Sequence, residues 1–136
     1  MFNHIWSVIC QSSSIDKQNN SINLFSCIEN INVKRKEINN NILPINFNLV
    51  SCWIINNPNE KNNLIFKISI VDPDGQVILE KDQEIITEVG WQRIRNIAKF
   101  SGLKINNSGR YLFKISQKEN DFKVVATLPV DINIDQ

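Results

Sequence analysis

The feature that most constrains the fold of this chain is the strict alternation of side chains near its end. Every even-numbered position over residues 122–134 is apolar, whereas most odd-numbered positions there are not. Successive side chains of a β-strand point to opposite faces, so a period of two predicts a half-buried strand. Pro129 cannot donate a backbone hydrogen bond, and it predicts a sheet edge or a bulge.

The same alternation recurs through the chain, and we expect further strands near residues 2–10, 22–28, 45–55, 64–70, 77–81 and 110–116. In the strand expected near residues 2–10 both faces are apolar, which predicts a central strand buried from two sides. We expect this strand to form a hairpin with the one near residues 22–28. The apolar phase shifts near Glu29 and Asn30, which predicts a bulge or a crossing between sheets.

Residues 82–99 fit a strand, an irregular segment or a short helix, and we favour strand or irregular chain. About eight short strands and no convincing helix indicate an all-β sandwich more than a barrel. The 136 residues fit one domain, and we expect a single β-sandwich domain over residues 1–136.

Composition and charge narrow the classes of function. The formal net charge of +1 argues against binding to nucleic acid or to an anionic membrane. No apolar run approaches the roughly 20 residues that cross a bilayer, and the first residues do not resemble a signal peptide. We therefore expect a cytoplasmic protein without membrane contact.

The three cysteines, Cys10, Cys27 and Cys52, lie in apolar stretches and lack CxxC spacing. This pattern indicates buried, reduced thiols rather than a disulfide framework or a zinc site.

The segment from Asn107 to Phe113 resembles the tyrosine corner of immunoglobulin-like sandwiches. In that motif a Gly-x-Tyr, here Gly109 and Tyr111, opens a strand, and the tyrosine hydroxyl bonds to nearby backbone. Phe113 stands where antibody domains have a cysteine, so no disulfide joins the sheets at that point. The resemblance implies an immunoglobulin-like antiparallel sandwich, with Trp53 as the core tryptophan opposite Phe113.

A wider resemblance covers most of the chain. It is similar to an uncharacterised family of short bacterial single-domain β-sandwich proteins through the segments SINLFSCIENI, DPDGQVIL, FSGLKI, GRYLFKIS and LPVDINI. These motifs consist of turn and core residues. The resemblance therefore implies a fold, and it implies no activity, cofactor or binding site.

Residues Asp72 to Gly75, of sequence Asp-Pro-Asp-Gly, have the preferred residues of a type I turn. Asp72 and Asp74 also offer a weak calcium site if Asp131 or Asp135 joins them from another loop. The turn already accounts for all four residues, so we favour the structural role and predict no metal site.

The sequence is poor in catalytic groups. His4 is the single histidine, and no metal ligands lie near it in sequence. No GxSxG, GxGxxG or GxxxxGK motif is present. We expect no catalytic residues, no cofactor and no enzymatic activity.

The candidate interaction surface consists of Trp91, Arg93 and Arg95, which would share one face of a strand. An aromatic ring beside arginines can stack on bases or sugars, or anchor a protein interface. The alternative is a solvated strand in which the arginines pair with Glu84 or Glu88.

Two hypotheses of function follow. The leading one is a non-enzymatic protein-interaction or structural module whose partner is an unknown protein or a second copy of the chain. The alternative is a sandwich that binds carbohydrate or nucleic acid around Trp91. A concave cleft lined by exposed tryptophan and polar groups would favour the ligand, and a flat apolar patch or open edge would favour the protein partner.

Overall fold

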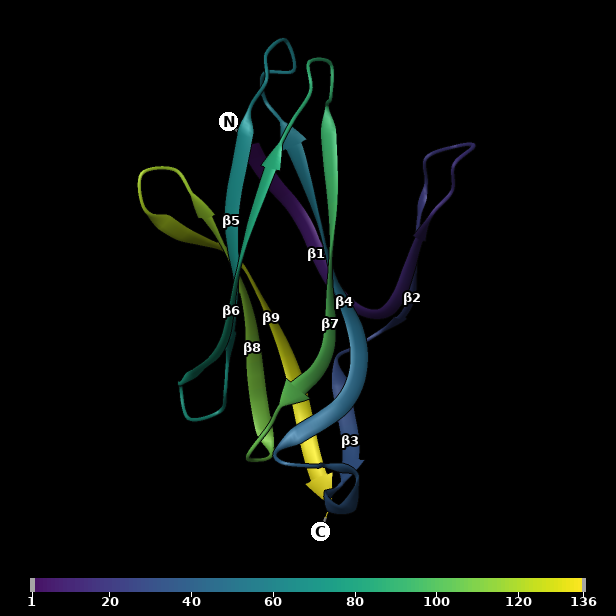
Figure 1. Cartoon of the computed structure of the whole chain (residues 1–136), viewed down its shortest axis with the longest axis vertical. Helices are drawn as coiled ribbons and strands as arrows, with labels where there is room; N and C mark the ends of the chain where they lie inside the picture. Colours follow the sequence, from purple (N-terminus) through teal and green to yellow (C-terminus); the bar gives the residue numbers. More distant parts are fainter. Residues whose placement is uncertain (1, 136) are drawn as a thin grey trace.

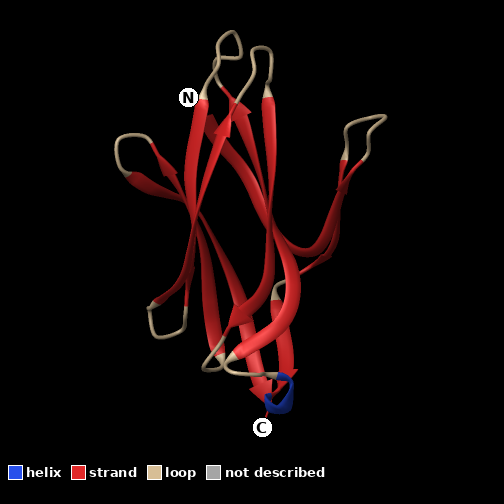
Figure 2. Cartoon of the chain, in the orientation of Figure 1, coloured by secondary structure: helices blue, strands red, loops and turns tan. Residues whose placement is uncertain are grey.

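A computed structural model describes residues 2–135, and strands dominate it (Figures 1 and 2). The expected all-β sandwich is confirmed, with nine strands in place of about eight. In chain order the elements are β1 (Phe2–Ile15), β2 (Ile22–Cys27), β3 (Asn30–Lys34), the short 3₁₀ turn η1 (Arg35–Glu37), β4 (Ile42–Ile55), β5 (Asn63–Val71), β6 (Val77–Ile86), β7 (Arg93–Lys104), β8 (Gly109–Lys118) and β9 (Phe122–Asp135). No helix within residues 2–135 is long and apolar enough to cross a membrane.

The strands form two sheets. The four-stranded sheet has the order β2-β1-β4-β7, and the five-stranded sheet has the order β3-β9-β8-β5-β6. Neighbouring strands are antiparallel, as expected, with one exception: β3 and β9 are parallel. The reason is that β3 is reached by a crossing from the other sheet and not by a hairpin.

That crossing lies where the apolar phase shifts in the sequence. Ser26, near the end of β2, has a φ of 55°, and β2 and β3 belong to different sheets. The carbonyl of Glu29 then accepts a 2.9 Å hydrogen bond from the backbone N–H of Asp131. The predicted crossing near Glu29 and Asn30 is confirmed.

Aromatic side chains fill the core between the sheets. Phe47 stacks on Phe100 at 4.9 Å between ring centroids and meets Phe113 edge-on at 5.8 Å. Trp53 is fully buried and packs on Phe66, with 5.1 Å between the ring centroids. The expectation that Trp53 lies opposite Phe113 was wrong. The β4 residue that meets Phe113 is Phe47, and six residues of strand, roughly 20 Å, separate Trp53 from Phe47.

Strand β1 is central, between β2 and β4, as predicted. Its burial from two sides is incomplete, because the register shifts between His4 and Trp6 and leaves Ile5 52% exposed.

The apolar, even-numbered residues of β9 do not all face the core. A register shift opposite Ile115 and Ser116 leaves Phe122 and Val124 exposed, so the even positions face the core only beyond that point. Pro129 lies just before the stretch in which β3 pairs with β9, where one side of β9 has no neighbouring strand. Its predicted edge position is confirmed.

The ambiguous segment over residues 82–99 is mainly strand. It contains the end of β6, a connecting loop and the start of β7. Ile94 and Ala98 of this segment are buried, so only part of it lies on the surface.

Candidate functional site

The tyrosine corner is present and is structural. The Tyr111 hydroxyl donates a 2.8 Å hydrogen bond to the carbonyl of Asn107, and the side chain is fully buried. Burial raises the pKa of this hydroxyl. Gly109 has a φ of +144°, and a Cβ there would lie 2.8 Å from Cγ of Pro73. The corner is therefore packed directly against the Asp72–Gly75 turn.

The carboxylates considered for calcium have other partners. Asp72 accepts hydrogen bonds from the N–H groups of Asp74 (3.0 Å) and Gln76 (2.8 Å). Its carbonyl accepts a 3.0 Å bond from the N–H of Gly75, as the turn requires. Asp74 accepts a 3.2 Å bond from Asn107 Nδ2. No group of three acidic, histidine or cysteine side chains suited to a metal ion occurs among the described residues.

Asp131 and Asp135, the two possible additional calcium ligands, are also engaged. Arg110 binds the Asp131 carboxylate through Nε (2.8 Å) and Nη2 (3.0 Å). The hydrogen bond from Arg110 lowers the pKa of Asp131. Asp135 accepts a 3.2 Å bond from Asn133 Nδ2.

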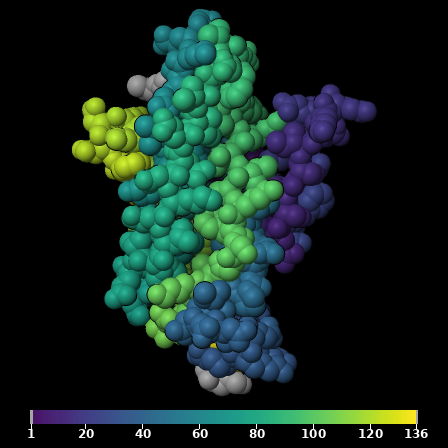
Figure 3. All heavy atoms as spheres, viewed as in Figure 1, coloured from purple at the N-terminus to yellow at the C-terminus, as the bar shows by residue number. Residues whose placement is uncertain are grey.

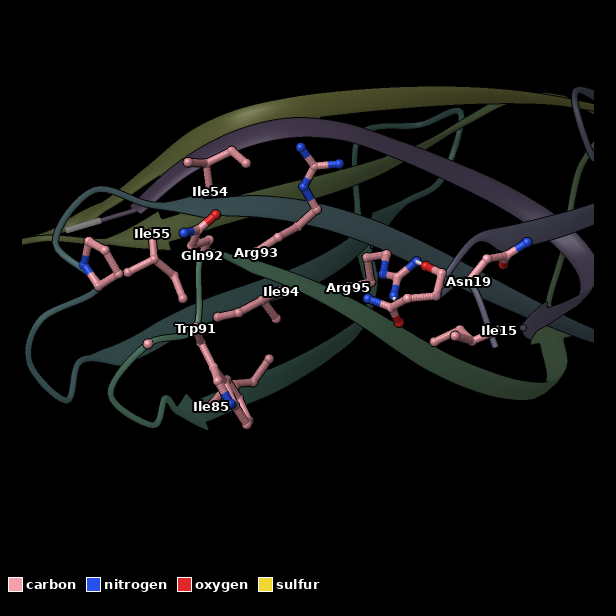
Figure 4. A pocket seen from close by; sticks show the side chains of 13 residues that line it. Ile15, Asn19, Ile54, Ile55, Ile85, Trp91, Gln92, Arg93, Ile94 and Arg95 are labelled. Atoms are coloured by element: carbon pink, nitrogen blue, oxygen red, sulfur yellow. Dashed lines mark hydrogen bonds between the residues drawn. The ribbon is translucent and has the colours of Figure 1, made fainter. Parts of the chain in front are cut away.

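A broad hollow of the surface surrounds the predicted residues Trp91, Arg93 and Arg95. We call it the Trp91 trough (Figure 4). Its volume is about 1050 Å³. The lining comes from the tip of the β1–β2 hairpin, the ends of β4 and β6, and the start of β7. It consists of Ile15, Asn19, Asn20, Ile54, Ile55, Pro58, Ile85, Gly90, Trp91, Gln92, Arg93, Ile94 and Arg95.

One wall of the trough is the arm, the hairpin of residues 11–26 that projects from the body of the sandwich (Figures 1 and 3). Its tip is attached to β7. Arg95 Nη1 donates a 2.7 Å bond to the Asn20 carbonyl, and Nη2 donates a 2.6 Å bond to Asn20 Oδ1. Asn20 has a φ of 58°, a conformation that asparagine tolerates better than most residues.

Trp91 lies before β7 and not within it. Gly90, with a φ of +95°, donates a 2.7 Å backbone bond to Pro58, and the carbonyl of Gln92 accepts a 3.0 Å bond from Ile55. These bonds fix the backbone on both sides of Trp91, whose side chain is 46% exposed. The side chains of Trp91, in the connecting loop, and of Arg93, at the start of β7, point in opposite directions (Figure 4). The expectation that they share a strand face was therefore wrong.

Arg93 and Arg95 do share a face, the outer face of the four-stranded sheet. The residue paired with Arg95 on β4 is the buried Cys52. Burial raises the pKa of the Cys52 thiol, and the charges of the two arginines act in the opposite direction. Both guanidinium groups therefore exert their field on one region of the sheet.

The ion pairs that the alternative assigned to these arginines, with Glu84 or Glu88, are not formed among the described residues. Glu88 pairs with Lys61 at 3.4 Å, and Glu84 accepts a 3.0 Å bond from Asn63 Nδ2. Within the described residues, the lining of the trough contains two arginines and no acidic side chain. The trough is consequently a cationic surface on a nearly neutral protein.

Sequence reasoning missed the contribution of Asn19, Asn20, Gln92 and Ile54 to the trough. Asparagine is abundant throughout the loops of this chain, so nothing in the sequence marks Asn20 as the partner of Arg95. The outward position of Ile54 depends on register, which alternation alone does not specify.

A second, smaller hollow of about 490 Å³ lies where the chain crosses between the sheets. Its lining includes Cys27, Pro129, Arg110 and Asp131. The last two neutralise each other, so this hollow has no free charge from that pair to offer a ligand.

Comparison with known proteins gives a likeness of fold. No protein-family model and no curated protein matches the sequence. Membership of the bacterial sandwich family therefore stays a prediction. Among solved structures, the chain is similar to the crystal structure of the C-terminal domain of wzt, with a TM-score of 0.52 and 14% sequence identity. The match covers 99% of this chain and 75% of that chain, and at this identity it shows a shared β-sandwich fold alone.

Proposed function

We propose that this protein is a non-enzymatic β-sandwich that binds a saccharide in the Trp91 trough. The observation that carries the proposal is the concave shape of the trough, with a half-exposed tryptophan at one end and amide and guanidinium groups along it. Aromatic rings stack on the apolar faces of sugars, and planar polar groups bind hydroxyl groups in pairs. This combination favours a ligand over a flat protein interface.

The charge of the lining narrows the expected ligand. Arg93 and Arg95 face the trough without an acidic residue in its lining. A guanidinium group binds carboxylate, sulfate or phosphate more strongly than it binds a neutral hydroxyl. We therefore expect an acidic saccharide to bind more tightly than a neutral one of equal length.

The first experiment measures binding of acidic and neutral oligosaccharides by calorimetry, with a single-stranded oligonucleotide as a further probe. Trp91→Ala should reduce saccharide affinity at least tenfold. Phe122→Ala is the matched control, because Phe122 is a 39% exposed aromatic residue outside the trough. Equal effects of the two variants, or tighter binding of the oligonucleotide than of every saccharide, would contradict the proposal.

The second experiment tests the contribution of charge. Arg93→Gln should reduce the preference for acidic over neutral oligosaccharides. Lys99→Gln, on the same face of β7 but outside the trough, should leave it unchanged. Loss of the preference in both variants would indicate a general charge effect and not a site.

A protein partner is the second candidate, and a separate observation favours it. Ile86, Val89 and Trp91 are 63%, 60% and 46% exposed and lie close together in the chain at the β6–β7 connection. Exposed apolar groups of this kind are typical of interface anchors. If a second copy or another protein binds here, Val89→Glu should disrupt assembly, measured by light scattering, while saccharide binding persists.

A further inference from the structure

Two of the three cysteines lie directly opposite each other at the base of the arm. Cys10 of β1 and Cys27 of β2 are paired in the antiparallel register. The next pair carries the backbone hydrogen bond, since the N–H of Ile28 donates to the carbonyl of Ile9 at 2.8 Å. Cys10 and Cys27 are therefore a non-hydrogen-bonded pair, in which side chains approach most closely.

This geometry suits a disulfide. Directly opposite residues of a non-hydrogen-bonded pair have Cα atoms about 4.5 Å apart, within the range of about 4.4–6.8 Å found in disulfides. Burial is the main cause that raises the pKa of the Cys10 thiol, and the neighbouring Cys27 raises it further. In the structure all three cysteines are free thiols.

The two thiols differ in their access to solvent. Cys10 is fully buried, whereas Cys27 is exposed. The expectation that all three thiols are buried was therefore wrong at Cys27, which lies at the end of the largely exposed strand β2. Cys52 is also buried and lies on β4, away from this pair in the register. A small oxidant in solution therefore reaches Cys27 first, and Cys10 is the thiol placed to react next.

We propose that Cys10 and Cys27 are a site of thiol–disulfide exchange with small disulfides such as oxidised glutathione. The Cys27 thiolate attacks one sulfur of the oxidant, forms a mixed disulfide and releases one glutathione thiolate. The Cys10 thiolate then attacks the Cys27 sulfur and releases the second glutathione. The protein loses two electrons and two protons, and oxidised glutathione becomes two molecules of glutathione.

The link would act on the arm. Strand β2 has β1 as its one neighbouring strand, and most of its residues are exposed. A bond between Cys10 and Cys27 closes the loop of residues 11–26 at its base and limits separation of the two strands. Closing a loop of this kind restricts the unfolded chain and stabilises the folded arm.

The experiment treats the full chain with oxidised glutathione and counts thiols after denaturation without reductant. The count should fall from three to one, and the protein should become lighter by two hydrogens. Peptide mapping should join Cys10 to Cys27. Hydrogen exchange of the arm amides should slow, and the denaturant midpoint should rise.

Three variants make the test specific. Cys10→Ser should stop at a glutathione adduct on Cys27, Cys27→Ser should keep both remaining thiols, and Cys52→Ser should still form the link. Retention of three thiols by the native protein, an accumulated glutathione adduct on it, or a link that includes Cys52 would overturn the proposal. None of these outcomes depends on whether the trough binds a saccharide.

Discussion

The outer faces of the two sheets differ, although their inner faces are built alike. Across the five-stranded sheet, one outward row consists of Ser69, Lys114 and Thr127. Across the four-stranded sheet, one outward row consists of Val8, Val50 and Ile97. Val50 is fully buried even though it lies outside the core between the sheets. At these two rows, the five-stranded sheet is apolar only on its inner face, whereas the four-stranded sheet is apolar on both faces.

The difference indicates where the molecule has a surface to use. A polar outer face needs no cover, whereas an apolar one is stable only when side chains or another element shield it. In the four-stranded sheet, Cys52 lies between Trp6 and Arg95 in one row, and its side chain is fully buried. The Trp91 trough lies at the end of this face, where the arm meets β7.

The largest expected effect comes from introducing an aspartate into each of the two outer rows and comparing the loss of stability. Val50→Asp places a carboxylate between Val8 and Ile97, where neither paired side chain can bond to it, and should cost about 3 kcal/mol of unfolding free energy. Thr127→Asp places the same group beside Lys114 on an exposed face and should change stability by less than about 0.5 kcal/mol. Urea unfolding measures both.

A milder exchange covers the case in which Val50→Asp does not fold. Val50→Thr should cost about 1–2 kcal/mol, because it buries a hydroxyl without a partner. Thr127→Val should cost almost nothing. Equal effects of the paired variants would show that the two outer faces are equivalent.

The second prediction concerns the contact that stabilises the end of the five-stranded sheet. Gly109→Ala places a methyl group against the Pro73 ring, on a backbone conformation that alanine rarely adopts. We expect a loss of about 2 kcal/mol. Gly75→Ala is the control, because it has a φ of +87° but nothing within 4 Å of the added methyl group. A loss equal to that of the control would assign the effect to backbone strain and not to the contact with Pro73.

The third prediction concerns the hydroxyl of the corner. Tyr111→Phe removes the 2.8 Å bond to the Asn107 carbonyl and leaves the buried ring in place. It should cost about 1 kcal/mol, the net contribution of one intramolecular hydrogen bond. An unchanged unfolding midpoint would mean that water replaces the hydroxyl at this carbonyl.

The inner face of the sandwich could be predicted from the sequence, because burial on one side imposes a period of two. Phe47, Leu49, Trp53 and Ile55 lie on one face of β4 as their spacing indicates, and all are buried. The tyrosine corner was also predictable, since its residues are local in sequence and their roles follow from backbone geometry.

The outer layer and the trough could not be predicted from alternation in the same way. Apart from Ser51, residues 49–55 are apolar at both odd and even positions. This pattern indicates a strand that is buried on two sides, but the side chains that cover it come from β1 and β7, which the pattern does not identify. Trp91 fits the spacing of a strand with Arg93, yet the positive φ of Gly90 places it in the preceding turn. The contact between Arg95 and Asn20 joins residues 75 positions apart, and local sequence contains no record of it.

The smallest expected effect is a dependence of stability on pH that arises in the four-stranded sheet. His4 packs edge-on against Trp53 at 5.0 Å, and its Nε2 lies 2.6 Å from the Ser7 hydroxyl. Burial lowers the pKa of His4 below its ordinary value of 6.5. The unfolded chain therefore takes up a proton at a higher pH than the folded chain does. The contribution of His4 to stability is present in full above pH 6.5 and is lost as the pH falls from there towards the folded pKa.

His4→Gln should remove this dependence, because glutamine does not titrate and can still bond to Ser7. Urea midpoints measured between about pH 7.5 and 5, above the ordinary range of carboxylates, should decline for the native protein and stay level for the variant. The chain has one histidine, so a decline of equal size in both proteins would have to come from another group. It would contradict the assignment of a lowered pKa to His4, and with it the view that the His4–Trp53 contact excludes water from the end of the four-stranded sheet.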